Sequence, residues 1–318
     1  MKGLVLVHGG AGPMRSMTGE REQAYRDGLA AAARAGRDAL ARGEGALAAV
    51  AAATRLMEAS GAFNAGCGSC LDAEGRYALD AAVMRGADRA AGAVAAAAAT
   101  LHPIDVCLDL LAEGRHVLLA GEGADRRARR LGLPPLPPPP PDKLETYQRM
   151  RAARPTRLED LATVGRPDDE ERDPGQDTVG AVAVDAHGRV AASVSTGGLW
   201  LKEVGRVGDS AVLGAGLFAC DELGAAASAT GIGERMLRAV TSYYACLRAG
   251  EADAAAAARA AVEDLARRFG EDSGGVVVVD RAGRCGAAFN TSGMGRALAR
   301  VGEPEVPVAV WPEDPFPA

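Results

Sequence analysis

The residue whose type and position point most directly to chemistry is Thr178. It precedes a run of small and β-branched residues, Val179 to Val184, that predicts a buried strand. A break in the chain before Thr178 would put a hydroxyl and a free α-amine on one residue at the strand tip. An α-amine has a pKa of about 7.7–8.0 and can act as a base near neutral pH, so such a threonine is an activated nucleophile. The alternative is an ordinary threonine at a strand edge.

Two further groups of residues could act with such a nucleophile. Thr230 and Gly231 stand in a glycine-rich segment that predicts the start of a helix, where backbone N–H groups can bind an oxyanion. The alternative there is a simple N-cap. Arg206 and Asp209 carry opposite charges between glycines. They could pair in solvent, which contributes little to stability, or they could hold the carboxylate and ammonium groups of a zwitterion.

The elements that must position these residues follow from periodicity and turn signals. After the first strand, the glycine-rich residues 8–13 predict a turn that lets backbone approach another group closely. An apolar strand carries one carboxylate, Asp80, which needs a partner if buried. The tail from Gly302 is rich in proline and is expected to be loose. Strands are predicted at 4–7, 77–84, 116–120, 178–185, 189–198, 223–229, 276–279 and 284–289, and helices at 20–42, 44–60, 103–113, 121–131, 230–247 and a last one ending at 269; 90–100 is not assigned.

The composition changes sharply between Pro134 and Thr178. Prolines dominate residues 134–141 and favour a polyproline II segment. A charged stretch poor in apolar residues follows up to Gln176, with one short helix predicted at 143–151. A flexible linker over 134–176 that ends at a candidate nucleophile suits self-cleavage between Asp177 and Thr178 better than it suits a domain boundary.

Composition narrows the class of protein. The 318 residues include 48% hydrophobic residues, enough for a sizeable core. A net charge of −6 argues against nucleic acid as a partner. The start, residues 1–7, is too short an apolar run for a signal peptide, and no run is long enough to span a membrane. Cys67 and Cys70 have CxxC spacing without a second pair, so no structural zinc site is expected. These features predict a protein of the reducing cytoplasm.

Six segments together resemble the plant-type L-asparaginase/isoaspartyl peptidase family of N-terminal nucleophile hydrolases. They occur in order and span nearly the whole chain. They are His8-Gly9-Gly10-Ala11-Gly12, Phe63-Asn64-Ala65-Gly66, Asp177-Thr178-Val179-Gly180-Ala181-Val182, Ser195-Thr196-Gly197-Gly198, Gly205-Arg206-Val207-Gly208-Asp209-Ser210 and Thr230-Gly231-Ile232-Gly233-Glu234. The sequence departs from the family pattern at Ala211, where proline is frequent, and in its long proline-rich segment.

The resemblance implies an α+β fold, a four-layer αββα sandwich formed by one domain over residues 1–318. It implies self-cleavage into an α chain, 1–177, and a β chain, 178–318, which assemble as a homodimer of αβ units. Thr178 would be the nucleophile and Thr196 would tune it. Thr230 and Gly231 would stabilise the oxyanion, and Asn64 would lie near the nucleophile. Arg206 would hold the substrate α-carboxylate, and Asp209 with the Gly233 carbonyl region the α-ammonium.

The resemblance implies no redox or organic cofactor. It does imply a structural sodium ion held by backbone carbonyls, which by position belong to Met57, Glu58, Ser60, Phe63, Ala65 and Cys67. Backbone ligands need no particular side chain.

The implied activity is hydrolysis of the side-chain amide of L-asparagine and of the isopeptide bond of β-aspartyl dipeptides, with release of L-aspartate. The preference between these substrates stays open. One alternative is a hydrolase of glycosyl-asparagine, as in aspartylglucosaminidases, against which the lack of a signal peptide argues. The other is an uncleaved amino-acid-binding protein. On a denaturing gel, a single band near 32.4 kDa would favour the binder, and two smaller bands the hydrolase.

Overall fold

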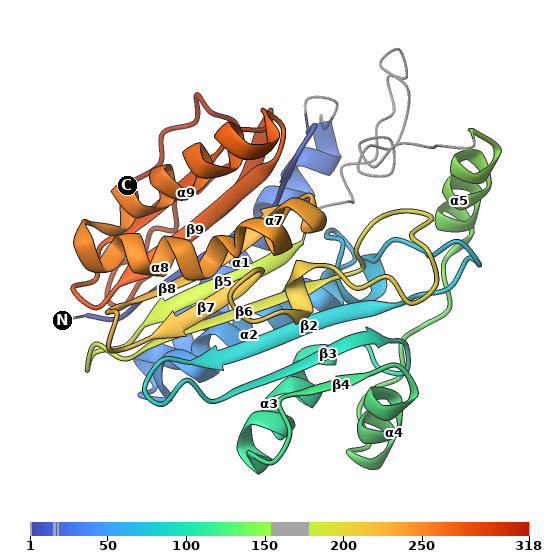
Figure 1. Ribbon diagram of the computed structural model, residues 1–318, viewed down its shortest axis with the longest axis horizontal. Coiled ribbons are helices and arrows are strands. Elements are labelled where there is room, and N and C mark those ends of the chain that lie inside the picture. Colours follow the sequence, from blue (N-terminus) through green and yellow to red (C-terminus); the bar gives the residue numbers. More distant parts are fainter. Residues whose placement is uncertain (1, 15–16, 18, 154–177, 318) are drawn as a thin grey trace.

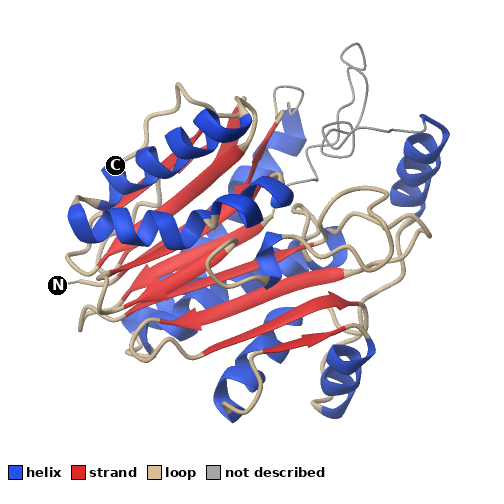
Figure 2. Cartoon of the chain, in the orientation of Figure 1, coloured by secondary structure: helices blue, strands red, loops and turns tan. Residues whose placement is uncertain are grey.

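The computed structural model describes residues 2–14, 17, 19–153 and 178–317. Its strands form two stacked β-sheets, and helices cover the outer face of each (Figure 1). Figure 2 shows α8 and α9 in front of the strands, with α1 and α2 behind them. The arrangement is a mixed α+β fold with two sheets flanked by helices.

The larger sheet holds the strand that follows Thr178. It has eight strands in the order β12-β11-β1-β5-β6-β2-β3-β4. The pairs are antiparallel apart from β3 and β4, which are parallel. The strand β5 therefore lies deep in the sheet, between β1 and β6. The bounds are β1 Leu4–Gly12, β2 Leu79–Arg85, β3 Ala91–Ala97, β4 Leu118–Ala120, β5 Val179–Val184, β6 Val190–Thr196, β11 Gly293–Arg300 and β12 Val308–Ala309.

The smaller sheet is fully antiparallel, with the order β10-β9-β8-β7. Successive residues of a strand point to opposite faces, and β5 uses this to face two cores. Val179 and Ala181 pack toward the helices, whereas Val182 and Val184 pack against the smaller sheet. Burial on both faces fixes the strand register. The bounds are β7 Leu217–Cys220, β8 Ala225–Gly231, β9 Gly274–Asp280 and β10 Cys285–Phe289.

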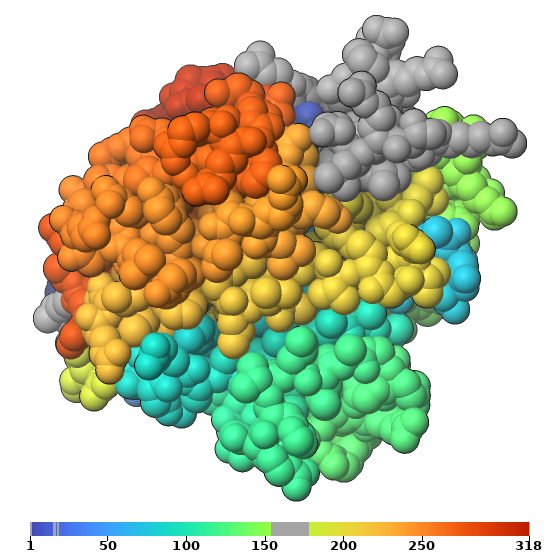
Figure 3. Space-filling model, viewed as in Figure 1, coloured from blue at the N-terminus to red at the C-terminus, as the bar shows by residue number. Residues whose placement is uncertain are grey.

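Helices rich in alanine cover the sheets closely. The helices α1, α2 and α3 pack on the larger sheet, and α8 and α9 on the smaller one. In the space-filling view, the green segment with α3 and α4 projects from the body of the molecule at the bottom (Figure 3). The bounds are α1 Gly19–Ala41, α2 Gly45–Ser60, α3 Pro103–Glu113, α4 Glu122–Arg130, α5 Pro141–Ala153, α7 Gly233–Ala239, α8 Thr241–Glu251 and α9 Ala254–Phe269, with single 3-10 turns at Gly66–Gly68 and Asp209–Ala211.

The first part of the predicted linker is structured. The helix α5 extends the short helix predicted at 143–151, and it buries Tyr147 and Met150 in a small apolar cluster with Trp200. Pro134 accepts a hydrogen bond from the backbone of Leu101 at 2.9 Å. The predicted cleavage site at Asp177 lies outside the described residues.

Three predicted elements are wrong, each for a physical reason. The predicted turn at 8–13 is largely a continuation of β1, paired with β11 across an irregularity between His8 and Gly10. Gly9 makes room for a helix side chain, since a Cβ on it would lie 2.7 Å from the Tyr25 hydroxyl oxygen. The predicted helix over 230–247 is two helices, α7 and α8, that break at Val240 with φ at +51°.

The third error concerns the carboxyl-terminal region, where β11 and β12 were not predicted. β11 pairs with β1, and β12 with β11. The tail after Gly302 is held rather than loose, because Val310 is fully buried and Asp314 pairs with Arg26 at 2.8 Å. Among the described residues, no helix is both long and apolar enough to cross a membrane.

Candidate active site

The structure brings the two predicted threonines together at the ends of β5 and β6. Thr178 is buried, and its Oγ1 donates a hydrogen bond to Thr196 Oγ1 at 3.2 Å. The register explains this, because Val179 pairs with Ser195 and the next residues outward are Thr178 and Thr196. The Gly198 N–H also donates to Thr196 Oγ1, at 2.9 Å. The lone pairs of Thr178 Oγ1 therefore remain available for attack on an electrophile.

Thr230 and Gly231 lie at the end of β8, in the facing sheet. Thr230 is fully buried, and its Oγ1 accepts a hydrogen bond from the Ala11 N–H at 3.2 Å. The hydroxyl hydrogen of Thr230 is thus left to donate elsewhere. Gly231 has φ at +139°, and a Cβ there would lie 2.4 Å from the Ser273 carbonyl oxygen. This position accepts only glycine, as the close backbone approach requires.

A buried histidine links β1 of the larger sheet to β8 of the smaller sheet. His8 on β1 forms a hydrogen bond through Nε2 to Ser228 Oγ on β8, at 2.8 Å. Both atoms occupy space left by Gly180 on β5, whose Cβ would lie 2.3 Å from His8 Nε2 and 2.2 Å from Ser228 Oγ. Burial lowers the pKa of His8 to about 3, and this effect outweighs the hydrogen bond with the Thr178 backbone, which raises the pKa. The neutral imidazole therefore acts as a spacer between the two sheets beside Thr178.

Arg206 and Asp209 are not a solvent-exposed pair. The Arg206 side chain is 14% exposed, and it pairs with Glu234 rather than with Asp209. Its Nε and Nη2 donate to the two Glu234 oxygens, each at 3.0 Å. A Cβ on Gly233 would lie 2.9 Å from both Arg206 Nη2 and Asp209 Oδ1, so the three residues line one space. The pairing in solvent that the sequence left open is excluded by this burial.

Asp209 is a buried carboxyl group with an unused oxygen. Asp209 is 3% exposed, and its Oδ2 has no hydrogen-bond partner among the residues that the structure describes. Burial raises its pKa to about 7, although the charge of Arg206 opposes the shift. A buried carboxylate without a partner is unfavourable, so the site is suited to a cation that arrives with a ligand.

Asn64 and Asp80 hold the loops that carry these groups. The Asn64 side chain donates through Nδ2 to the Gly198 carbonyl at 2.8 Å, and the Asn64 backbone carbonyl accepts the Gly197 N–H at 2.9 Å. It thereby fixes the loop directly after Thr196. Asp80 meets the predicted need for partners, because its oxygens accept the N–H groups of Ala96 and Gly208, each at 2.9 Å.

The carbonyls predicted to hold sodium belong to the last turn of α2 and to the loop that follows it. A Cβ on Gly66 would lie 2.1 Å from the Glu58 oxygen, and one on Gly68 would lie 1.9 Å from the Phe63 oxygen. Backbone carbonyl oxygens are neutral ligands that suit a hard cation. The Cys67 carbonyl already accepts hydrogen bonds from Tyr77 and Lys143. The described residues contain no cluster of His, Cys, Asp and Glu side chains that could hold a metal.

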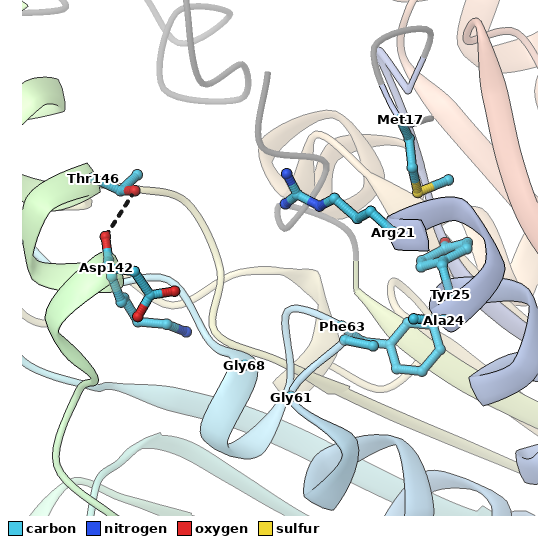
Figure 4. A pocket seen from close by; sticks show the side chains of 11 residues that line it. Met17, Arg21, Ala24, Tyr25, Gly61, Phe63, Gly68, Asp142 and Thr146 are labelled. Atoms are coloured by element: carbon cyan, nitrogen blue, oxygen red, sulfur yellow. Dashed lines mark hydrogen bonds between the residues drawn. The ribbon is translucent and has the colours of Figure 1, made fainter. Parts of the chain in front are cut away.

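A separate pocket of about 270 Å³ opens between α1, the loop after α2, and α5 (Figure 4). Phe63 and Tyr25 face it on one side, and Asp142 and Thr146 on the other. Of the predicted site residues, only Phe63 lines it. The pocket is therefore distinct from the space between Arg206, Asp209 and Gly233.

Sequence reasoning missed three residues of this region. Glu234 was assigned only to the start of a helix, and His8 to a turn. Lys202 was not singled out, although it is 2% exposed and donates to the Gly197 carbonyl at 2.8 Å. No local pattern marks a lysine or a histidine for burial, and only the fold shows it.

The fold and site thus define a class of protein with a paired-threonine centre beside a charged pocket. Comparison with known proteins then gives the family. Residues 1–306 match the family described as asparaginase. The chain belongs to this asparaginase family.

Individual relatives cover almost the whole chain. It is 41% identical to the plant-type L-asparaginase of Pyrobaculum calidifontis, over 94% of this chain and 97% of the relative. It is 38% identical to the isoaspartyl peptidase of Salmonella typhimurium, over 95% and 96%. It is 35% identical to the isoaspartyl peptidase/L-asparaginase of Xenopus laevis, over 94% and 93%.

Proposed function

We propose that this protein is an amidohydrolase that hydrolyses the side-chain amide of L-asparagine and the isopeptide bond of β-aspartyl dipeptides. The product in both reactions is L-aspartate. The observation that carries the proposal is the hydrogen bond between Thr178 and Thr196 at two adjacent strand ends. The names of the family members at 35–41% identity support the choice of substrates.

The enzyme would form by cleavage of its own chain before Thr178, into residues 1–177 and 178–318. The fold would then be an αββα sandwich of the N-terminal nucleophile hydrolase type, formed by a single domain. Cleavage frees the Thr178 α-amine, which is the only base that the mechanism needs close to the hydroxyl.

Hydrolysis would proceed by acyl transfer through Thr178. Its Oγ1 attacks the side-chain carbonyl carbon of the substrate, and its α-amine takes the hydroxyl proton. The hydroxyl of Thr230 and the N–H of Gly231 stabilise the negative oxygen of the tetrahedral intermediate. The C–N bond then breaks, and the ammonium of Thr178 gives its proton to the leaving amine. Water next attacks the β-aspartyl ester and releases L-aspartate.

The charged pocket would select the substrate head group. Arg206 would bind the α-carboxylate. Asp209 Oδ2, which has no hydrogen-bond partner among the described residues, would bind the α-ammonium. Gly233 leaves room for both because it carries no side chain. Asn64 would act by holding the loop at Gly197 and Gly198.

A structural sodium ion and a homodimer are also part of the proposal, although the mechanism does not use them. The carbonyls of Met57, Glu58, Ser60, Phe63, Ala65 and Cys67 would hold a sodium ion that stabilises the loop carrying Asn64. The αβ units would assemble as a homodimer, which light scattering during gel filtration measures directly.

The decisive experiment follows processing and turnover of one preparation. Intact mass should change from the full chain to fragments 1–177 and 178–318, and ammonia release from L-asparagine should appear in parallel. A chain that stays intact for days while binding L-aspartate would support the amino-acid-binding alternative. Preferential cleavage of glycosyl-asparagine would support the aspartylglucosaminidase-like alternative.

A further inference from the structure

Lys202 is a buried cation with an unused proton. It is 2% exposed, and its ammonium donates to the carbonyl oxygens of Ala78 and Gly197. An ammonium carries three donors, so one remains without an acceptor in the part of the chain that the structure describes. The ion pairs among those residues include none with Lys202. A buried ammonium without a paired carboxylate is unfavourable, so binding of an anion would stabilise it.

The third N–H of the Lys202 ammonium lies near a nitrogen of Arg206 that Glu234 does not use. Arg206 uses Nε and Nη2 for Glu234, which leaves Nη1. A Cβ on Gly198 would lie 2.9 Å from Arg206 Nη1 and 2.9 Å from Lys202 Nζ. The two cationic nitrogens therefore lie against the same side of Gly198, which has no side chain to separate them.

The surrounding carboxylates do not neutralise the positive charge of Lys202 and Arg206 beside Gly198. Burial lowers the pKa of Lys202, the charge of Asp80 opposes that shift, and the charge of Arg206 adds to it. Both oxygens of Asp80 accept backbone N–H groups, so this carboxylate is engaged elsewhere. Glu234 meets Arg206 on its opposite edge. Two cations directed at one point are stabilised when an anion binds between them.

We propose that Lys202 is the second cation of the subsite for the substrate α-carboxylate. One carboxylate oxygen binds Arg206 Nη1 and the other binds Lys202 Nζ, while the α-ammonium lies at Asp209. The inference rests on the proposed function. It adds that selectivity for a free α-carboxylate depends on two side chains, one of them a lysine that also holds the loop at Gly197.

A purely structural role for Lys202 must be separated from this one, because Gly197 is adjacent to Thr196. L-asparagine and its α-amide differ only in the charge that Lys202 would recognise. Loss of a structural tie would lower kcat/KM equally for both substrates. Loss of a carboxylate partner would lower it for L-asparagine alone.

The test measures kcat/KM for both substrates in processed Lys202→Met. Lys143→Met is the matched control, because Lys143 also donates to two carbonyls, Cys67 at 3.2 Å and Ser69 at 2.7 Å. We expect the ratio of L-asparagine to α-amide to fall ~10-fold in Lys202→Met, the effect of losing one hydrogen bond to a charged group. The ratio should be unchanged in Lys143→Met. Equal losses on the two substrates, or no loss, would overturn the proposal.

Two further measurements test the proposal if Lys202→Met does not fold. Lys202→Gln keeps amide donors for the carbonyls without the charge, and the same fall in the ratio is expected. In crystals of the unsubstituted enzyme with L-aspartate, an α-carboxylate oxygen should lie ~3 Å from Lys202 Nζ. A carboxylate bound by Arg206 alone would contradict the assignment. Failure of the parent enzyme to hydrolyse L-asparagine would instead refute the proposed function.

Discussion

The candidate site combines two regions built on opposite principles. The nucleophile corner (Thr178, Thr196 and Thr230) consists of neutral hydroxyls at or beside strand ends. The head-group pocket (Lys202, Arg206, Asp209 and Glu234) consists of charges, mostly in the loop between β6 and β7. Backbone hydrogen bonds and register hold the first region, whereas ion pairs and buried charges define the second.

The difference predicts different responses to substitution. In the nucleophile corner each hydroxyl has a defined partner, such as Thr196 for Thr178 and the Ala11 N–H for Thr230. Loss of one atom there removes a step of the chemistry. In the head-group pocket several charges share the same space, so loss of one weakens recognition and leaves the chemistry possible.

The largest effect is expected for Thr178→Ala. It removes the oxygen proposed to attack the substrate, so both self-cleavage and hydrolysis should be lost. Thr178→Ser keeps the hydroxyl but loses the methyl group that restricts χ1, and it should retain part of both activities. Intact mass and ammonia release measure the two processes. A Thr178→Ala protein as active as the parent would exclude this nucleophile.

A smaller but still large effect is expected for Thr230→Val. The substitution keeps the shape of the side chain and removes the hydroxyl that would donate to the oxyanion. Removal of one such donor lowers kcat by ~10²–10³. Thr230→Ser is the matched control and should stay close to the parent. Steady-state kinetics on processed protein decide, and a Thr230→Val variant with parental kcat would remove Thr230 from the oxyanion site.

The head-group pocket should respond less, and only when a head group is present. Arg206→Ala removes the charged partner proposed for the α-carboxylate, and a hydrogen bond to a charged group contributes roughly 1.5–3 kcal/mol. We expect kcat/KM to fall at least ~10-fold. Arg206→Lys should also be impaired, because lysine lacks the planar fork.

Self-cleavage is the internal control for Arg206→Ala. The bond before Thr178 presents no free amino-acid head group, so the rate of processing should change much less than hydrolysis does. Equal losses in both reactions would show that Arg206 supports the fold of the nucleophile corner rather than the head-group pocket.

The same contrast explains what the sequence could predict. The hairpin of β5 and β6 follows from small and β-branched residues on either side of the turn from Asp185 to Gly188. Once the register of this hairpin is known, Thr178 and Thr196 fall opposite each other. The end of β8 shows the limit, because Gly231 ends a strand and does not open a helix. Whether a polar segment continues a strand depends on the neighbouring strand, which the local sequence does not contain.

Ion pairing was the harder part to predict. The spacing of Arg206 and Asp209 suggested that they act on one ligand, but the partner of Arg206 is Glu234, 28 residues away. The burial of Lys202 likewise depends on carbonyls of Ala78 and Gly197. Such contacts arise from the way loops meet, and hydrophobic periodicity carries no information about them.

The smallest predicted effect concerns pH and tests the head-group pocket without a substitution. Burial raises the pKa of Asp209 to about 7. Below that pH the carboxyl is protonated and neutral, and above it the carboxylate attracts the α-ammonium of the substrate. Binding of a zwitterion should therefore strengthen as pH rises from 6 to 8, by up to ~10-fold in kcat/KM.

The Thr178 α-amine titrates in the same range, so a second substrate must separate its titration from that of Asp209. Succinamic acid, which is asparagine without its α-amino group, shares the dependence on the amine and lacks the ammonium. The ratio of kcat/KM for L-asparagine to that for succinamic acid should increase with pH in the parent and be flat in Asp209→Asn. A flat ratio in the parent would mean that Asp209 is not the partner of the α-ammonium.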